Sequence, residues 1–343
     1  MNRSDHVRRR ACRWIMPFLP GLLLSCAACA DEPVQAIEAG RIVEALKRAL
    51  PIVETAAESY PYHRECFSCH HQTLPMLAMV AAQRRGLETN GKLLAEQAEF
   101  THKSFRESTD GLQKGEGIGG RAMTVGYGLW ALRLAERKPD ETTAAMVMYL
   151  LKTQKAEGHW ERQMSRPPLE DSNVTCTVLA AHGMRRHAAE TQRAEVDAAV
   201  SKAKDWLAQA KVESQEDQVA RLWGIDLLGG DEMERKAARE TVLASQRDDG
   251  GWGQLKELPS DAYATGQTLY ILQATGLAPD EPAYRRGAEF LLRTQCEDGS
   301  WFVKTRSKPI QEYFDNGDPH GENQFISVPA TCWAVAALAA AEP

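Results

Sequence analysis

The residues with the clearest chemical meaning form a short segment, Cys66-Phe67-Ser68-Cys69-His70. Two cysteines separated by two residues and followed directly by a histidine are the attachment motif of c-type haem. Each thiol can form a thioether with one vinyl group of the haem, and the adjacent imidazole then reaches the iron as an axial ligand. The motif therefore predicts a haem bound at Cys66 and Cys69, with His70 as iron ligand.

The same segment admits other chemistry, and the sequence leaves the choice open. In an oxidising compartment Cys66 and Cys69 can form a disulfide, and His70 then has no ligand role. Zinc is the alternative cofactor, because two thiolates with one or two of His70, His71 and His320 make a four-coordinate site. A chance occurrence of the motif is the third alternative.

The first thirty residues indicate export. They combine a basic start over 3–13, an apolar stretch over 14–24 that is too short to cross a membrane, and the small residues Ala28-Cys29-Ala30 before Asp31. This is the pattern of a cleaved signal peptide, and an uncleaved apolar anchor is the alternative. Leu23-Leu24-Ser25-Cys26 is a competing lipoprotein site, at which acylated Cys26 anchors the chain to the membrane.

Either route predicts a periplasmic or envelope-anchored protein, with a signal peptide over 1–30 and a single domain over 31–343. Removing residues 1–30 takes five Arg and one Asp from 41 basic and 47 acidic residues, which leaves 36 and 46 and a net charge of −10. This balance argues against a nucleic-acid partner, which requires a basic face. Five cysteines remain, an odd number that cannot pair completely.

Three segments of the chain repeat one pattern, in which a glutamine precedes a tryptophan by six residues across a glycine turn. They run from Gln154 to Trp160, from Gln246 to Trp252 and from Gln295 to Trp301. The glutamines are 92 and 49 residues apart, so a degenerate copy belongs between the first two, and Lys204–Gln209 is that copy. A period of 40 to 50 residues is typical of stacked supersecondary units.

Each unit is predicted to be a pair of helices, one amphipathic and one apolar nearly all round. The amphipathic, outer helices are expected near 33–56, 90–107, 140–154, 193–210, 231–246 and 281–295. The apolar, inner helices are expected near 72–86, 121–136, 172–187, 217–229, 261–275 and 327–341. An open solenoid is the alternative arrangement, but the last inner helix is as apolar as any other, which favours a closed ring.

These glutamine-to-tryptophan turns resemble the QW repeats of squalene–hopene cyclases and related prenyltransferases. The resemblance implies an all-α, (α/α)6 toroid of six helical hairpins, with the tryptophans in structural roles and a central cavity that takes an apolar small molecule. Small exported variants of this toroid also resemble the chain in its Ser68-Cys69-His70-His71-Gln72 segment and in Pro319-His320-Gly321.

A closed ring brings candidates for a second haem ligand near His70. His320 precedes the last inner helix, and Met123 begins the second, so both approach the face opposite His70; we favour His320. Tyr127 and Trp333 are among the aromatic residues that either line a cavity or pack in the core, a set completed by Trp130 and Tyr263.

The resemblance does not extend to the cyclase acid. Type II terpene cyclases protonate an alkene with an aspartate of a DxDD motif, whereas Asp171 and Asp261 stand alone at the corresponding helix starts. They are weak catalytic candidates, and the expected role of Asp171, Asp217 and Asp261 is capping of inner helices. We therefore expect no conversion of squalene to hopene, and the residues leave open whether the chain is an enzyme.

Three functions remain open at this stage. The first is a haem protein in redox or small-molecule chemistry, with a redox partner. The second is a protein that binds or processes an isoprenoid. The third is a non-catalytic interaction module with a disulfide or zinc at the cysteine pair.

Overall fold

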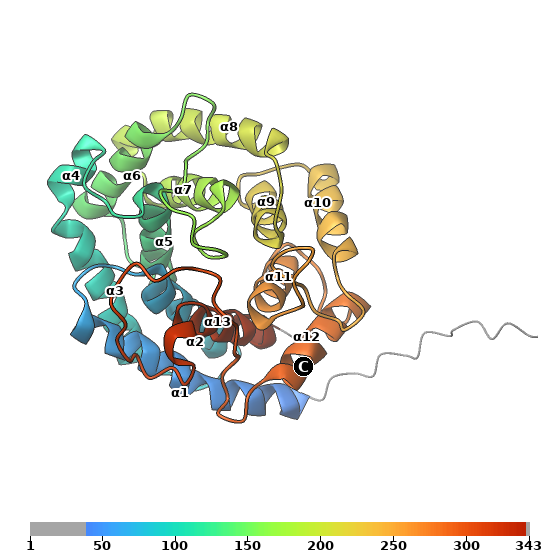
Figure 1. Cartoon of the computed structure of the whole chain (residues 1–343). Coiled ribbons are helices and arrows are strands. Elements are labelled where there is room, and N and C mark those ends of the chain that lie inside the picture. Colours follow the sequence, from blue (N-terminus) through green and yellow to red (C-terminus); the bar gives the residue numbers. More distant parts are fainter. Residues whose placement is uncertain (1–38, 341–343) are drawn as a thin grey trace, which may run out of the picture. The chain divides into compact units, whose positions relative to one another are not determined.

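The computed structural model describes residues 39–340, which form two concentric rings of α-helices (Figure 1). The outer helices are α1 (Ala39–His63), α3 (Gly91–Arg106), α6 (Glu141–Thr153), α8 (Arg193–Gln209), α10 (Glu232–Ala244) and α12 (Pro282–Thr294). The inner helices are α2 (Leu74–Arg84), α5 (Arg121–Leu134), α7 (Asn173–His187), α9 (Gln215–Leu227), α11 (Ala262–Ala274) and α13 (Gln324–Ala340). The expected signal peptide and the lipoprotein site at Cys26 fall outside the described residues.

The all-helical prediction is confirmed, and all twelve expected helices are present. Over residues 39–340 there is no β-strand, and pairing is limited to one isolated bridge between Arg166 and Glu170. The structure adds α4 (Thr109–Lys114), the π-helical turn η1 (Cys69–Thr73) and the 3-10 turns η2 (Glu190–Gln192) and η3 (Gly321–Asn323). α1 ends later than expected because Tyr60 continues its buried stripe.

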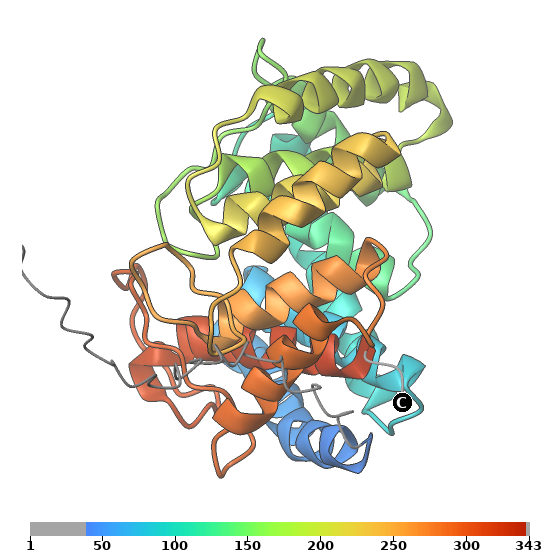
Figure 2. The ribbon, with the colours of Figure 1, turned by 90° about the vertical axis from the view of Figure 1, so that its right-hand side faces the viewer.

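The inner ring is closed. α13 packs against both α11 and α2, so the first and last inner helices lie side by side, as predicted (Figures 1 and 2). The α11–α13 contact depends on Gly266, because a Cβ there would lie only 2.7 Å from the backbone nitrogen of Ala334. The open solenoid is therefore wrong.

α13 is the most apolar helix of the ring. Residues 321–340 are long and apolar enough to cross a membrane by length and composition alone, but 83% of the apolar 18-residue stretch within them is buried inside the protein. Its buried residues include Ser327, Thr331 and Cys332 as well as aliphatic side chains. This burial is the behaviour expected of a core helix, because the neighbours α2 and α11 cover its sides.

The glutamines of the three turns join adjacent outer helices. Each Nε2 donates one hydrogen bond to the carbonyl of the turn glycine, at 2.8–2.9 Å, and a second to a carbonyl near the start of the next outer helix, at 2.7–2.8 Å. Gln154 thereby reaches Ala199 of α8, and Gln246 reaches Ala283 of α12. Gln295 reaches Ala45 of α1, which closes the outer ring.

The tryptophans of these turns are fully buried: Trp160, Trp252 and Trp301. Each indole N–H donates to a carbonyl ten residues earlier, in the preceding outer helix, at 2.8–3.0 Å. The polar edge of each ring is thus satisfied while its large apolar surface leaves water. The geometry agrees with the structural role implied by the QW resemblance.

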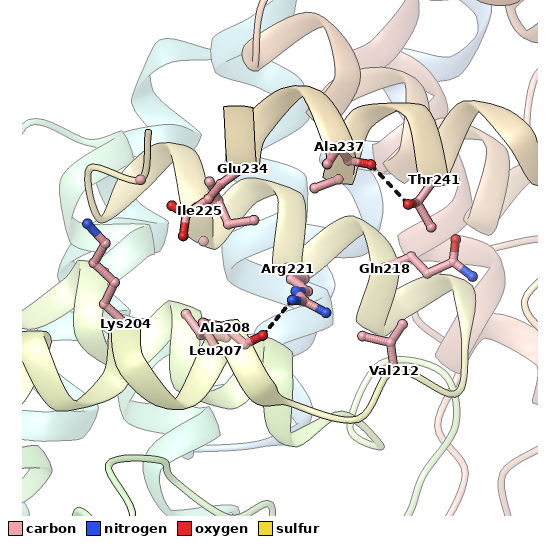
Figure 3. Close-up of a pocket in the computed structure, with 13 residues that line it drawn as sticks. Lys204, Leu207, Ala208, Val212, Gln218, Arg221, Ile225, Glu234, Ala237 and Thr241 are labelled. Atoms are coloured by element: carbon pink, nitrogen blue, oxygen red, sulfur yellow. Dashed lines mark hydrogen bonds between the residues drawn. The ribbon is translucent and has the colours of Figure 1, made fainter. Parts of the chain in front are cut away.

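The degenerate copy has a different structure. Trp206 lies within α8 itself, half-buried, and stacks on His159 with ring centroids 4.8 Å apart. No glutamine-to-tryptophan turn follows α8, and a cavity of about 360 Å³ opens between α8, α9 and α10, lined by Leu207 and Ile225 among others (Figure 3). The helices α8, α9 and α10 therefore pack less tightly against one another than the helices joined by the three complete turns.

The expected aspartate caps are right for one helix and wrong for two. Asp261 caps α11 by accepting from the backbone of Ala264 at 2.9 Å. α7 is capped by Ser172, and α9 by Ser214, because in both cases a serine hydroxyl stands at the position where the helix begins. Asp171 instead pairs with an arginine, and Asp217 completes the capping box of α9.

We expect Trp252→Ala to lower the free energy of unfolding by about 3–5 kcal/mol, because it leaves a large cavity beside α10 and removes the indole hydrogen bond to the Val242 carbonyl. Trp206→Ala is the matched control and should cost clearly less, since Trp206 is half-buried. Chemical denaturation followed by circular dichroism measures both. Equal effects of the two substitutions would contradict the structural role of the turn.

Candidate functional site

The cysteine–histidine segment lies at the entrance to the first inner helix. Cys66 follows the end of α1, and Cys69 begins the π-helical turn η1, which continues directly into α2. Gln72 stabilises this turn through two hydrogen bonds to Ser68. Its side-chain Oε1 accepts from the backbone N–H of Ser68 at 2.8 Å, and its backbone N–H donates to the Ser68 carbonyl at 2.9 Å. Single π-turns inside helices frequently occur at functional sites.

The two cysteines differ in environment. Cys66 is exposed, and its Sγ lies 3.5 Å from the hydroxyl of Tyr60. Cys69 is 6% exposed, and its Sγ lies 3.7 Å from Oε1 of Glu170. Burial, and then the charge of Glu170, raises the pKa of the Cys69 thiol well above its usual value, so this thiol is protonated at neutral pH.

The two histidines are neutral. Burial, followed by His71 and Arg166, lowers the pKa of His70 well below its usual value, and burial lowers the pKa of His71 to about 3. Ser68 Oγ lies closer to Nδ1 of His70, at 3.1 Å, than to Nε2, at 3.5 Å. A neutral imidazole with Nδ1 hydrogen-bonded keeps Nε2 free to donate an electron pair to a metal. His71 is already engaged, because Asn316 Nδ2 lies 2.7 Å from its Nε2.

A loop after the first QW turn folds over this segment. Arg166 forms an ion pair with Glu170 at 3.0 Å and stacks on Phe325, with its guanidinium 4.1 Å from the ring centroid. Ser307 Oγ donates to the carbonyl of Pro167 at 2.8 Å, which ties this loop to a second one. Leu169, at the tip, is fully buried.

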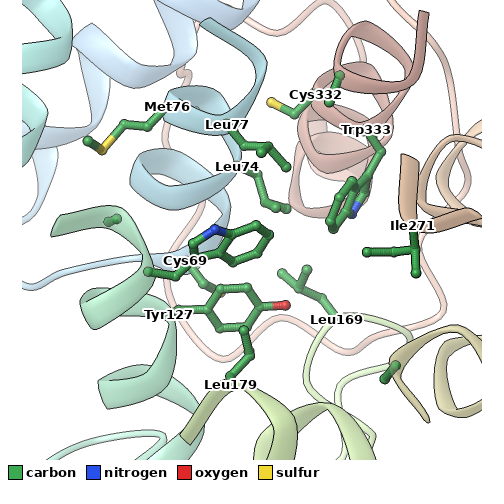
Figure 4. Packing of buried hydrophobic residues seen from close by; sticks show 14 of the residues in the cluster. Cys69, Leu74, Met76, Leu77, Tyr127, Leu169, Leu179, Ile271, Cys332 and Trp333 are labelled. Carbon is green, nitrogen blue, oxygen red and sulfur yellow. The ribbon is translucent and has the colours of Figure 1, made fainter. Parts of the chain in front are cut away.

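The tip of this loop fills the middle of the inner ring. Figure 4 shows Leu169 directed toward the same space as Tyr127, Ile271 and Trp333. The aromatic residues that the sequence offered as cavity lining are all buried, and Trp130 contacts Trp333 with centroids 6.1 Å apart. In this structure they pack the core.

Two adjoining cavities flank the segment. Cys66, Cys69 and His70 line a cavity of about 520 Å³. His70 also lines a second cavity, of about 530 Å³, whose walls include Phe325 and part of the loop 305–314. Tyr60, His70 and Arg166 belong to both, so the two spaces meet at these side chains. Each has the size typical of small-molecule and cofactor sites.

His320 lies in a different group. Its Nε2 is 2.6 Å from Ser300 Oγ, and one ligand atom each of His320, Cys296 and Asp298 lie within 4.8 Å of one another. Over residues 39–340 this is the cluster with the spacing of a metal site. Neither His320 nor Met123 is among the residues that line the two cavities beside His70.

No family model matches this chain. A squalene–hopene cyclase of Bradyrhizobium diazoefficiens is 30% identical over 208 residues, which are 58% of this chain and 24% of the cyclase, so the chain spans about a quarter of that relative. The type II terpene cyclase MstE from Scytonema superposes with a TM-score of 0.57 at 14% identity, over 88% of this chain and 98% of the cyclase.

The chain has the α/α-toroid fold of terpene cyclases. A wild-type glycosidase also superposes on it, with a TM-score of 0.60 at 11% identity, over 90% of this chain and 100% of the glycosidase. Since proteins named as a cyclase and as a glycosidase share the toroid, the fold does not decide the reaction, and the site must.

In this toroid the two lone aspartates are held by local partners. Asp171 pairs with Arg162 at 3.1 Å. Asp261 accepts from Gln254 Nε2 at 2.9 Å, and burial raises its pKa to about 6. A salt-bridged carboxylate and a weak acid are both poor proton donors toward an alkene.

Sequence reasoning missed one buried acid. Glu216, in the first turn of α9, accepts from Thr175 Oγ1 at 2.7 Å and from the Tyr263 hydroxyl at 3.0 Å, and so joins α7, α9 and α11. It is 4% exposed, and burial raises its pKa to about 7. A Ser-x-x-Asp capping box at Ser214 and Asp217 marks the helix start in the sequence, but no signal there shows which acid turns inward.

We expect purified protein incubated with squalene to form no hopene, because Asp171 and Asp261 lack the acidic neighbours of a cyclase acid. Gas chromatography of the extract measures this, with an active squalene–hopene cyclase as positive control. Hopene that disappears in Asp261→Asn would contradict this reasoning.

Glu216 should make stability depend on pH. Its pKa is higher in the folded state, so the folded state binds the extra proton between about pH 4.5 and 7, and stability falls as the pH rises through that window. A shift of this size corresponds to about 3 kcal/mol. Glu216→Gln should therefore lose less stability than wild type between pH 5 and 8, as followed by thermal unfolding. Parallel pH profiles of the two proteins would show that Glu216 is not the responsible group.

Proposed function

We propose that this chain is an exported α/α-toroid protein that carries a covalently attached c-type haem at Cys66 and Cys69, with His70 as iron ligand, and serves redox or small-molecule chemistry. The observation that supports the proposal is that all three side chains line the same cavity of about 520 Å³. The export predicted from residues 1–30 is part of the same proposal, because such attachment requires a compartment outside the cytoplasm.

The residues present fit the group. His70 is neutral, as an iron ligand must be, and Ser68 fixes the ring through Nδ1. Cys66 is exposed and so accessible to attachment from outside, whereas Cys69 is buried and would hold the inner side of the group. Zinc requires ligand atoms that converge, but over residues 39–340 the convergent group is that of Cys296, not of the motif cysteines.

A bound haem supplies one-electron chemistry or binding of a small oxidant. The chain's own residues would set its surroundings. Arg166 lies where the two cavities meet and, paired with Glu170, would place an ion pair beside a bound cofactor. Asn316 Nδ2 lies 2.7 Å from His71 Nε2, and Tyr60 stacks on the His71 ring with centroids 4.6 Å apart, so buried side chains pack the wall behind His70.

We expect protein made in a host with a haem-attachment system to show a Soret band. Cys66→Ala and Cys69→Ala should each leave at most one thioether, and His70→Ala should keep thioethers possible while changing the spectrum of the iron. Cys296→Ala is the matched control, because this cysteine lies outside the motif, and should leave the spectrum unchanged.

A colourless protein with one tightly held zinc per chain, lost on Cys69→Ala, would overturn the proposal. Zinc lost on Cys296→Ala instead, again without colour, would equally exclude the haem and would assign the metal to the Cys296, Asp298 and His320 group.

A further inference from the structure

The opposite end of the toroid carries a basin of about 1000 Å³ with an unusual charge. Seven of its lining side chains are Arg or Lys, and one, Glu136, is acidic. The full chain carries a net charge of −6, so this concentration of positive charge runs against the composition. The basin lies at the ends of α2, α5 and α7, and since His70 and Arg84 bracket α2, it is about 20 Å from the cysteine–histidine segment.

Helix dipoles alone do not explain the cluster. Cations are favoured at helix C-termini, but that preference applies to all six inner helices. Basic residues occupy the last turns of α2, α5 and α7, whereas the last turns of α9, α11 and α13 have none. The clustering on three consecutive helices therefore needs another cause.

Most of the positive charge is not neutralised by carboxylates. Two of the seven cations are paired, Arg137 with Glu99 and Arg193 with Glu190. Arg84 and Arg186 have no hydrogen-bond or ion-pair partner among the residues that the structure describes. The three helix C-termini supply roughly 1.5 negative charges in total, and Glu136 adds one more. This sum is smaller than the positive charge of the five remaining cations.

The basin residues also act on one another. The pKa of Arg133 is lowered mainly by burial and, second, by the positive charge of Arg186. Arg133 Nη1 lies 2.5 Å from Nε2 of His182, whose pKa is lowered to about 3 by burial and by Arg133, so this partner is neutral. Like charges held in one concave space repel one another until an anion enters.

We propose that this basin binds a phosphate-type polyanion, such as a diphosphate group, either in a soluble molecule or in the headgroup of an anionic lipid. Arginine forks match the oxygens of phosphate in geometry and charge. Arg84 and Arg186, without partners of their own, make the first contacts. Glu136 at the rim opposes the anion.

Calorimetric titration of the full chain with pyrophosphate tests the proposal. We expect binding that weakens with salt, a loss of at least about tenfold in affinity for Arg84→Gln/Arg186→Gln, and a gain for Glu136→Gln. Lys47→Gln/Lys236→Gln, which removes the same charge from exposed outer helices, is the matched control. Without anion, the arginine double variant should melt no lower than wild type, because repulsion is relieved.

Co-sedimentation with phosphatidylglycerol vesicles and with phosphatidylcholine vesicles separates the two sources. Pyrophosphate binding assigns the basin to soluble anions, and selective binding to phosphatidylglycerol vesicles without pyrophosphate binding assigns it to a lipid headgroup. Binding to neither probe, or equal binding by the arginine variant and the lysine control, would overturn the proposal. A clear drop in melting temperature of the arginine variant without anion would show that the cations serve only the helix ends.

Discussion

The hydrogen bonds of three glutamine side chains determine how the rings are assembled. Gln154, Gln246 and Gln295 each join the turn that ends one outer helix to the beginning of the next. In each pair of bonds, one acceptor is the carbonyl of the turn glycine, which lies outside any helix, and the other is a carbonyl in the first half of the next outer helix. One amide that bonds to both fixes the spacing of neighbouring hairpins, and the bond from Gln295 to Ala45 joins the last hairpin to the first.

Closure of the ring has consequences for every inner helix. A helix such as α13, apolar on all sides, is stable in water only if neighbours cover it, and the ring supplies α2 and α11. It also aligns the helix ends, so that the beginnings of inner helices meet at one rim and their last turns at the other. The cysteine–histidine segment occupies the first rim and the cationic basin the second. Where the repeat is degenerate, between α8 and α10, the packing opens into a cavity.

The fold was predictable because its causes are local and repeated. Alternating amphipathic and apolar segments gave the order of the helices, and the glutamine-to-tryptophan spacing gave the turns. The helix caps were harder to predict, because serine and aspartate are both good N-cap residues. Where they are adjacent, as Asp171 and Ser172 are, the sequence does not show which one caps the helix. Buried polar residues were the hardest to predict. Glu216 accepts hydrogen bonds from Thr175 and Tyr263, which are far from it in the sequence, so its burial could not be inferred from its neighbours in the chain.

The candidate site was predictable in its chemistry but not in its surroundings. The motif identified Cys66, Cys69 and His70, and they do line one space. The enclosing side chains come from loops that have no repeat pattern, so nothing in the sequence placed Arg166 against Phe325 or Asn316 against His71. His320 hydrogen-bonds to Ser300 of the turn from Gln295 to Trp301. This contact depends on how the loop before α13 folds back.

The central claim is that both motif thiols are bonded to one haem. Peptide mass spectrometry of protein matured in a haem-attaching host, digested without reduction, tests it most directly. The account predicts that the peptide containing Cys66 and Cys69 carries one haem and has no alkylatable thiol, while Cys296 remains free to alkylate. A peptide with a Cys66–Cys69 disulfide, or with two thiols that alkylate freely, would contradict it.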